Sequence, residues 1–198
     1  KDNGTQGHCY YEKDKIKSKV EEALDKNIRL SCHAIGESAI DQITEIYGEL
    51  EDRIPISGAM MRIDHFEFPS KKAVELIKKL PLAITVQPGF SWIDKHFLKS
   101  YEQFLPESII NRQLPLKDLM NSDVCVCGSS DSPVQSVNPY EQMLGMVDFY
   151  LPEQSITPYE ALKTYTINPA KMLGEPDTGT LKAGNDADFF VCDRDILS

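Results

Sequence analysis

Short apolar runs of strand length alternate along this chain with stretches of helical periodicity, and this alternation limits the fold more than any other feature. The apolar runs lie at 28–33, 61–68, 82–87 and 124–127. Helical periodicity covers 12–27, 39–50 and 116–120, and Ser70 is placed to cap a further helix. Strands separated by helices are typical of βαβ units. We therefore predict an α/β fold built on a parallel sheet.

The C-terminal part of the chain leaves this series. Residues 157–160 form a capping box with proline at the first helical position, which predicts the start of a helix. Asn168 and Pro169 are expected to interrupt that helix without ending its apolar pattern. A turn-rich stretch at 179–184 precedes an apolar run at 187–192, for which we predict a short strand outside the alternating series.

Charge and hydropathy exclude several classes of partner. The 198 residues carry a formal net charge of -10, which argues against binding to nucleic acid or to an anionic membrane surface. No apolar run approaches the length of a membrane span, and the N-terminal residues do not read as a signal peptide. We expect a cytoplasmic protein without a nucleic-acid or membrane partner.

The cysteines predict reduced thiols. There are five of them, an odd number, and four lie in or beside apolar runs, so a disulfide framework is not expected. Cys125 and Cys127 stand two residues apart on a predicted strand, which places both sulfurs on one face of the sheet. We predict that this pair packs in the core, because free cysteines are commonly buried.

Three side chains that can bind metal stand where predicted strands end: His33, His65 and Asp131. Because the carboxyl ends of parallel strands meet at one edge of a sheet, these three should lie together there. Two imidazoles and a carboxylate suit a divalent ion, zinc among them. Such an ion makes hydroxide available at neutral pH, and Asp131 could move the proton to a leaving nitrogen. The alternative is that both histidines are structural and that Asp131 caps the turn at 132–133.

Six segments carry a family resemblance. Residues 32–37 (CHAIGE), 62–65 (RIDH), 84–88 (ITVQP) and 128–134 (GSSDSPV) resemble motifs of the YtcJ-like amidohydrolases, a branch of the metal-dependent amidohydrolase superfamily. Residues 168–170 (NPA) and 179–188 (GTLKAGNDAD) resemble the motifs that close the superfamily's barrel. The resemblance implies a TIM-like (β/α)8 barrel beside a small β-sandwich, with hydrolysis of amide-type C–N bonds. By position, His33, His65 and Asp131 match metal ligands of barrel strands five, six and eight, and Asp131 also matches the catalytic acid–base.

The resemblance covers only part of the family pattern. The His-x-His pair of strand one and the ligand of strand four have no counterpart here, and Glu37 and Asp64 replace the family's aspartate and glutamate. The resemblance therefore implies the C-terminal half of a barrel at 1–172, strands five to eight, with residues 173–198 as a returning strand of the sandwich. A small-molecule substrate and the missing N-terminal half of the same polypeptide are the implied partners.

Two consequences follow for an isolated half-barrel. We expect weak binding of zinc or another divalent metal and little activity, because ligands are missing. We also expect two exposed strand edges, at 28–33 and 124–127, and through them a homodimer. The alternative function is a non-catalytic half-barrel with a regulatory or protein-interaction role, and within enzymes a deaminase would use similar ligands.

Some residues beside these motifs carry smaller predictions. Phe90 and Trp92 follow the third strand, where they either line a substrate pocket or cover the mouth of the barrel. For Arg112 we expect a surface ion pair.

Overall fold

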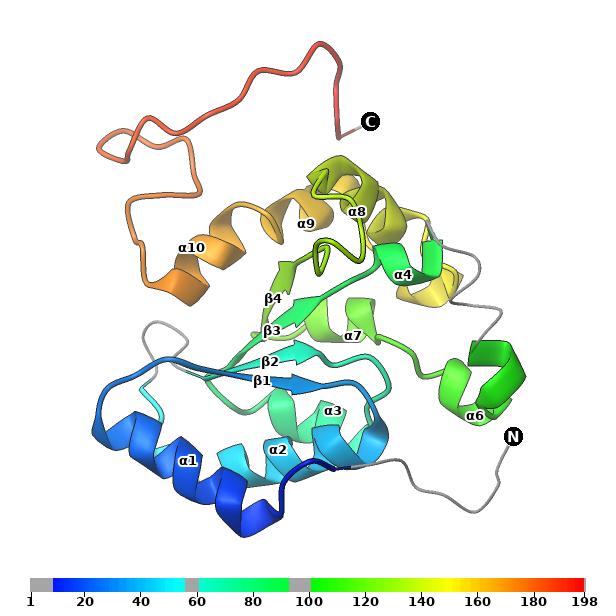
Figure 1. Cartoon of the computed structure of the whole chain (residues 1–198). Coiled ribbons are helices and arrows are strands. Elements are labelled where there is room, and N and C mark those ends of the chain that lie inside the picture. Colours follow the sequence, from blue (N-terminus) through cyan, green and yellow to red (C-terminus); the bar gives the residue numbers. More distant parts are fainter. Residues whose placement is uncertain (1–8, 56–60, 93–100, 198) are drawn as a thin grey trace.

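The structure of the protein is a computed structural model that describes residues 9–55, 61–92 and 101–197, with side chains of 91 and 92 excepted. Four parallel strands form one sheet in the order β1-β2-β3-β4 (Figure 1). The strands are β1 (Leu30–Ala34), β2 (Met61–His65), β3 (Ala83–Val86) and β4 (Cys125–Gly128). The predicted α/β class and parallel sheet are confirmed, with each strand within a few residues of its predicted run.

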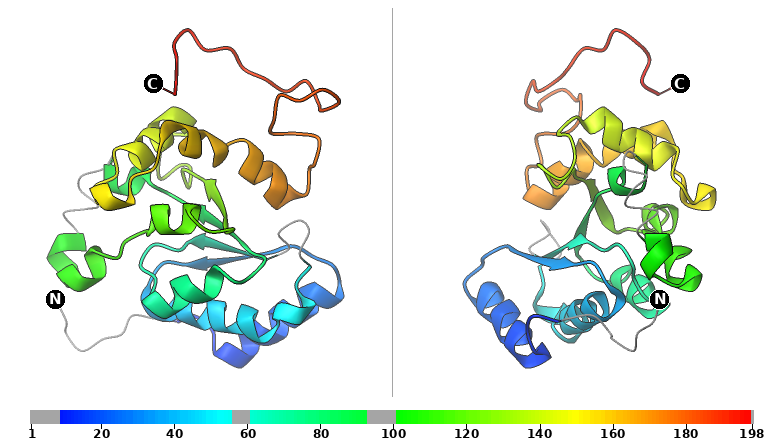
Figure 2. Two further views of the ribbon diagram at one scale, coloured as in Figure 1. Left: turned by 180° about the vertical axis from the view of Figure 1, so that it is seen from behind. Right: turned by 45° about the vertical axis from the view of Figure 1, so that its right-hand side comes forward.

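One helix precedes β1, and two more connect the first three strands. They are α1 (Lys13–Asp25), α2 (Glu37–Glu49) and α3 (Lys71–Ile77), with a 3-10 turn, η1 (Glu51–Arg53), after α2. The helices α1, α2 and α3 pack together on one side of the sheet (Figure 2). The apolar stripe of α2 is buried at Ile40, Ile43 and Ile46, as its periodicity predicts. Ser70 caps α3, its hydroxyl accepting a 3.0 Å hydrogen bond from the backbone N–H of Ala73.

The second half of the chain is mainly helical. Between β3 and β4 lie α4 (Gly89–Trp92), α6 (Glu107–Ile110) and α7 (Leu116–Met120). After β4 come α8 (Pro139–Val147), η2 (Pro152–Gln154), α9 (Pro158–Lys163) and α10 (Ile167–Leu173). The predicted capping box begins α9, with Thr157 and Glu160 bonded reciprocally. None of the described helices is long and apolar enough to cross a membrane.

The helix interruption lies earlier than the sequence predicts. The break falls at Thr166, whose backbone (φ −126°, ψ −91°) is not helical, and Pro169 lies inside α10. Proline has no N–H and its ring clashes with the carbonyl four residues before it, here that of Tyr165. The first helix must therefore end before Pro169. Asn168 and Pro169 then lie in the first turn of α10, where a missing N–H is tolerated.

The two faces of the sheet differ in chemistry. Side chains alternate along each strand, so residues in register on neighbouring strands share a face. One face carries Cys32, Ile63, Ile84 and Val126, which pack into the hydrophobic core against the helices. The other carries Ser31, Arg62, Thr85 and Cys127, with Ser31 exposed. A sheet with one polar face is unusual for parallel strands, which are commonly covered on both sides.

The two edges of the sheet are unequal. At β4, the Gly128 N–H donates to the Thr164 carbonyl (2.9 Å) and the Asn168 amide donates to the Val126 carbonyl (2.7 Å). The segment from α9 to α10 thus occupies hydrogen-bonding groups that an added strand would need. The expectation of two exposed edges is wrong for β4, because a distant segment folds back onto it. β1 has no second neighbouring strand among the described residues.

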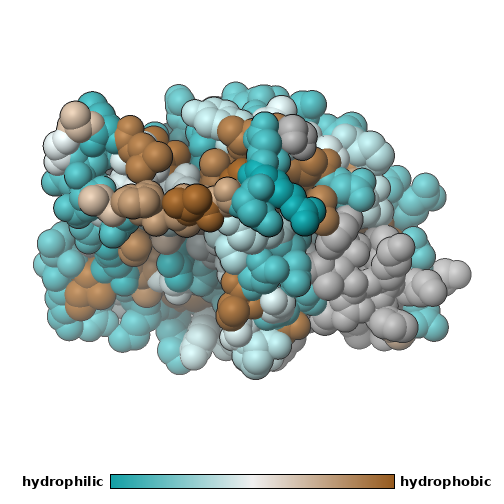
Figure 3. Space-filling view, turned by 90° about the horizontal axis from the view of Figure 1, so that it is seen from above, coloured by the Kyte–Doolittle hydropathy of each residue, from teal (hydrophilic) through white to brown (hydrophobic). Residues whose placement is uncertain are grey.

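The predicted strand at 187–192 is not formed. Residues 175–197 contain no strand, and the C-terminal segment extends away from the body of the molecule (Figure 1). Its apolar side chains face outward, with Phe190 55% and Val191 88% exposed. The view from above shows hydrophobic residues lying among hydrophilic ones on this face (Figure 3). An apolar run becomes a strand only where a neighbouring strand accepts its hydrogen bonds, and the described residues offer none here. The proposed boundary at 172 and 173 falls at the end of α10 and stays a prediction.

All five cysteines are free, as predicted. Cys127 is buried, Cys32 and Cys125 are half-buried, and Cys9 is exposed. The alternation along β4 places Cys125 and Cys127 on the same face, opposite the buried Val126.

Candidate metal centre

The two histidines predicted as ligands are in contact at the carboxyl ends of adjacent strands. His33 lies near the end of β1 and His65 is the last residue of β2. Their ring centroids are 4.4 Å apart and their planes are inclined at 71°. Parallel pairing between β1 and β2 brings these positions to one edge, as the sequence predicts.

A left-handed turn of the backbone makes this contact. By simple alternation His65 would share the core-facing side of Ile63, whereas His33 is on the other side. His65 and Phe66 both have positive φ (76° and 51°), which ends the alternation at this point. The turn is held by a hydrogen bond from the Phe66 N–H to the Ala34 carbonyl (3.1 Å), and by a further backbone hydrogen bond just after the end of β1. Such conformations cost about 1–3 kcal/mol in non-glycine residues and cluster at functional sites.

His65 is buried in a setting that favours the neutral imidazole. His65 is only 6% exposed. Its Nδ1 has no hydrogen-bond partner among the described residues. Burial lowers the pKa of His65, and the neighbouring His33 lowers it further, while Asp131 and Asp64 act in the opposite direction. A neutral ring with an unused, buried nitrogen is the form of histidine that binds a metal ion.

Asp131 follows β4 at the same edge of the sheet. The Ser129 N–H donates to the Val86 carbonyl (2.9 Å), which fixes the start of this loop to β3. Asp131 is exposed, has a positive φ of 51°, and lies near enough to His65 for its charge to raise that pKa. Two of the three predicted ligands therefore have left-handed backbones.

The three predicted ligands do not complete a metal site by themselves. In the part of the chain that the structure describes, no three histidine, cysteine, aspartate or glutamate side chains are grouped so as to hold an ion. The residues present nevertheless fit part of one: two imidazoles in contact, one with an unpartnered buried nitrogen, suit zinc or a similar divalent ion. Further ligands are required. The other two histidines, His8 and His96, lie outside the described residues.

Gln87 is a site residue to which sequence reasoning assigned no role. It is 8% exposed, and its side chain hydrogen-bonds His65. Its Nε2 also donates to Ser129 Oγ (3.3 Å), which in turn accepts from the Asp131 N–H (3.3 Å). Gln87 thus links the edge of β2 to the loop that carries Asp131. Its position at the end of the third predicted strand, beside the other candidate residues, could have indicated that Gln87 belongs to the site.

A polar cluster fixes β2 just below His65. Arg62 Nε pairs with Asp64 Oδ1 at 2.8 Å, and the hydroxyls of Ser31 and Thr85 donate to the same carboxylate. Burial raises the pKa of Asp64, but these hydrogen bonds and the charge of Arg62 outweigh it and lower the pKa overall. Asp64 therefore ties three neighbouring strands together as a carboxylate.

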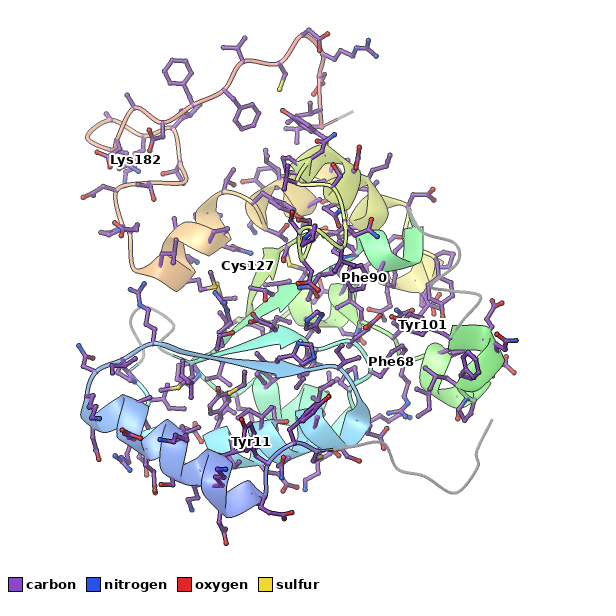
Figure 4. All side chains as sticks on the ribbon, viewed as in Figure 1. Tyr11, Phe68, Phe90, Tyr101, Cys127 and Lys182 are labelled. Atoms are coloured by element: carbon purple, nitrogen blue, oxygen red, sulfur yellow. The ribbon has the colours of Figure 1, made fainter. Side chains whose placement is uncertain are left out.

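Aromatic and charged residues surround the site. Phe90 is buried, and its ring centroid lies 6.3 Å from that of His65 (Figure 4). Phe90 thus lies beside the His65 imidazole; the Trp92 side chain is outside the described residues. Arg112 forms the ion pair that we expected, with Glu37 at 2.6 Å, and its guanidinium also donates to the Pro69 carbonyl (2.9 Å).

Comparisons of sequence agree with this arrangement. The chain is 26% identical to N-substituted formamide deformylase of Arthrobacter pascens, over 96% of this chain and 36% of that protein. It is 24% identical to "Putative amidohydrolase YtcJ" of Bacillus subtilis, over 98% of this chain and 38% of that protein. The chain therefore spans less than two fifths of the length of these relatives.

Comparisons of structure give the same coverage. An uncharacterized metal-dependent hydrolase from Pyrococcus horikoshii superposes with a TM-score of 0.83 at 24% identity, over 98% of this chain and 40% of that chain. Atrazine chlorohydrolase TrzN from Arthrobacter aurescens, solved with zinc, superposes with a TM-score of 0.60 at 18% identity, over 92% and 40%. The model of the amidohydrolase family matches residues 3–198, nearly the whole sequence. On that match, the chain belongs to the amidohydrolase family.

Proposed function

We propose that this chain is the C-terminal half of a metal-dependent amidohydrolase whose complete form cleaves amide-type C–N bonds. The observation that carries the proposal is the contact between His33 and His65 at the carboxyl ends of β1 and β2, with Nδ1 of His65 buried and unpartnered. Buried polar atoms are rarely left without a partner, so this one calls for a ligand.

The architecture supports a half-barrel. Four parallel strands in sequential order, β1 to β4, are what strands five to eight of a (β/α)8 barrel would provide. The polar face of the sheet and the unpaired edge of β1 would then face the missing N-terminal half. β4 would pair with strand one of that half only after the α9–α10 segment releases the Gly128 N–H and the Val126 carbonyl. Residues 173–198 would form their strand only on the sandwich of the complete protein, which accounts for the exposed Phe190 and Val191. The chain's share of its relatives, 36% to 40%, supports the same assignment.

The site residues fit hydrolysis. His33 and His65 would hold zinc or another divalent ion, and Asp131 would contribute its carboxylate. When bound, such an ion would supply hydroxide at neutral pH, because it would lower the pKa of water to about 7. Asp131 is exposed at the edge of the sheet, where its carboxylate can accept a proton from water and deliver it to a leaving nitrogen. Gln87 would hold the His65 ring in place through its hydrogen bond.

The isolated chain should be a poor enzyme. Catalytic zinc sites commonly use three protein ligands, and no such group is complete in the described residues. We therefore propose that zinc affinity and hydrolysis require the missing half of the barrel. A small-molecule substrate would bind across both halves, because its pocket lies at the mouth of the complete barrel.

The test uses the full-length parent polypeptide. Metal content is measured after extensive dialysis, and amide hydrolysis is screened across a panel of small amides. His65→Asn and Asp131→Asn should each lower kcat/KM by at least about 100-fold, with metal content reduced in the first, because a ligand and the proton acceptor are removed. Asp177→Asn, which changes an exposed carboxylate in the C-terminal segment, is the matched control and should leave both unchanged.

The alternative is a non-catalytic half-barrel with a regulatory or interaction role, which the incomplete ligand group favours. A parent that retains no metal, hydrolyses no amide and responds equally to all three substitutions would establish this alternative and refute the enzyme.

A further inference from the structure

The loop that follows β4, residues 129–138, buries a polar side chain and exposes its apolar ones. From 131 to 137 every residue is exposed except Gln135, which is only 9% exposed. Val134 and Val137, by contrast, are 48% and 76% exposed. Burying apolar side chains stabilises a fold and burying an amide does not, so this inverted arrangement needs an explanation.

The carboxamide of Gln135 has no protein partner. Its side chain forms no hydrogen bond with the residues that the structure describes. Four described side chains carry an unpartnered atom that is fully sealed from water: His65, Gln113, Gln142 and Tyr165. Gln135 is not among them, so its amide stays open to a small solute although more than nine-tenths of the residue is buried. A buried amide in this condition calls for a ligand.

Backbone hydrogen bonds fix Gln135 beside Asp131. The Gln135 N–H donates to the Ser130 carbonyl (3.2 Å), and the Val134 N–H donates to the Asp131 carbonyl (2.8 Å). These two bonds close a turn over 130–135 that contains both Gln135 and Asp131. The loop begins where β4 ends, at the same end of the sheet as the candidate metal centre (Figure 1). Gln135 is therefore held in place next to the proposed proton acceptor before any substrate binds.

A carboxamide recognises a group with a complementary hydrogen-bonding pattern. Its NH2 group donates and its carbonyl oxygen accepts, side by side in one plane. A primary amide or a urea-type group presents an acceptor and a donor at matching positions, so the two groups can pair through two hydrogen bonds. A ketone or an ester has no donor and can form only one of them. Such a fixed polar side chain sets the orientation and the choice of the molecule that binds.

We propose that Gln135 is a substrate-binding residue that selects molecules with a second amide-type group, a primary amide or a urea-type group, close to the scissile C–N bond. The inference rests on the proposed function and deepens it by naming the substrate class. Pairing with this second group satisfies the buried Gln135 amide. It also holds the scissile bond near Asp131, because the two residues share one turn. Gln135 thus recognises the substrate, and Asp131 moves the proton.

The test compares two substrates of the full-length parent that differ only in the second group. Glycinamide and aminoacetone are each N-acylated with the acyl group that the parent cleaves best in the amide screen, so that NH2 in one compound is CH3 in the other. The parent should show a kcat/KM at least about tenfold higher for the glycinamide compound, because the methyl ketone leaves the Gln135 acceptor unpaired. Gln135→Met keeps the length of the side chain and removes its polar groups. It should abolish this preference, mainly by raising KM for the glycinamide compound.

The matched control is Val137→Ala in the same loop. Val137 is 76% exposed and has no polar side-chain group, so this change should leave the preference as it is in the parent. Circular dichroism checks that each variant folds. If Gln135→Met does not, Gln135→Asn, which draws the carboxamide back by one methylene group, replaces it with the same expectation. A parent without the preference, or a preference that survives in the Gln135 variant, would overturn the proposal and leave the proposed function standing.

A binding measurement on the present chain decides the inference if the parent hydrolyses no amide and the proposed function fails. The side-chain NH2 signal of Gln135 is observed by NMR and is assigned by its disappearance in Gln135→Met. Acetamide should shift this signal strongly, whereas acetone, which has no N–H, should shift it much less. Equal shifts with the two compounds, or no shift with either, would refute amide recognition by Gln135. The two failures are therefore told apart.

Discussion

Replacing Gly128 by alanine should destabilise the protein at the point where β4 leads into the loop of Asp131. A Cβ atom at Gly128 would lie 2.1 Å from Cε2 and 2.3 Å from Cζ of Tyr165. Ordinary contact begins at 3.4 Å, so the ring or the strand must move by about 1.3 Å, the difference between 3.4 Å and 2.1 Å. The Tyr165 ring cannot move freely, because this half-buried residue packs against the hydrophobic core.

The expected cost follows from two opposing effects. Forcing a methyl group into packed structure costs about 1–3 kcal/mol, whereas restricting the unfolded chain at a former glycine recovers about 0.4–1 kcal/mol. We expect Gly128→Ala to lower the free energy of unfolding by roughly 1–2 kcal/mol. Urea denaturation followed by circular dichroism measures this as a lower midpoint with an unchanged slope.

Two further variants make the test specific. Gly36→Ala is the matched control: a Cβ there meets nothing within 4 Å, so the change should stay within about 0.5 kcal/mol. Tyr165→Ala removes the obstacle, and the double mutant with Gly128→Ala should show a favourable coupling of at least about 1 kcal/mol. The steric explanation is refuted if Gly128→Ala is as stable as the parent sequence, or if its cost persists in the Tyr165→Ala background.

Three other perturbations test the fold. Arg112→Ala should lower the free energy of unfolding by about 1–2 kcal/mol, because its partly buried guanidinium donates to two backbone carbonyls as well as to Glu37. Glu37→Gln removes only the ion pair and should lower it less. Equal losses in urea denaturation would show that only the ion pair matters. The hydrogen bonds from Thr157 lower the pKa of Glu160, so the capping box stabilises α9 above pH ~4.5 and loses this contribution as the pH falls through that pKa. Glu160→Gln should therefore remove part of the acid dependence of the melting temperature, and an unaltered dependence would contradict the assignment. The isolated chain should form a homodimer through β1 in sedimentation velocity, weakened by Ser31→Lys, and a monomer at high concentration would exclude it.

The sequence predicts most of this fold because local rules decide it. Strand-length apolar runs, the serine cap at Ser70 and the capping box at 157–160 each depend on neighbouring residues, and all three are confirmed. The parallel arrangement follows from the connecting helices. The placement of His33 and His65 at one edge follows in turn, because parallel strands end together.

Long-range contacts account for the rest. The left-handed backbone of His65 and the bridge made by Gln87 arise from packing between strands, which no local pattern encodes. The strand predicted at 187–192 does not form for the opposite reason. The segment has the propensity for a strand, but the described residues provide no neighbouring strand with which it could pair. Propensity for strands describes a fit to a neighbouring surface, so it cannot act alone.

The covered edge of β4 determines how large an assembly of this chain can become. Thr164 and Asn168 occupy one border of the sheet, so a copy joined at β1 offers no equivalent border for a third. Growth by strand addition would end at a closed, two-fold pair instead of continuing into a fibre. A substitution that removes the hydrogen bond from Asn168 to the Val126 carbonyl would thus expose this edge, and strand addition could then continue beyond a dimer.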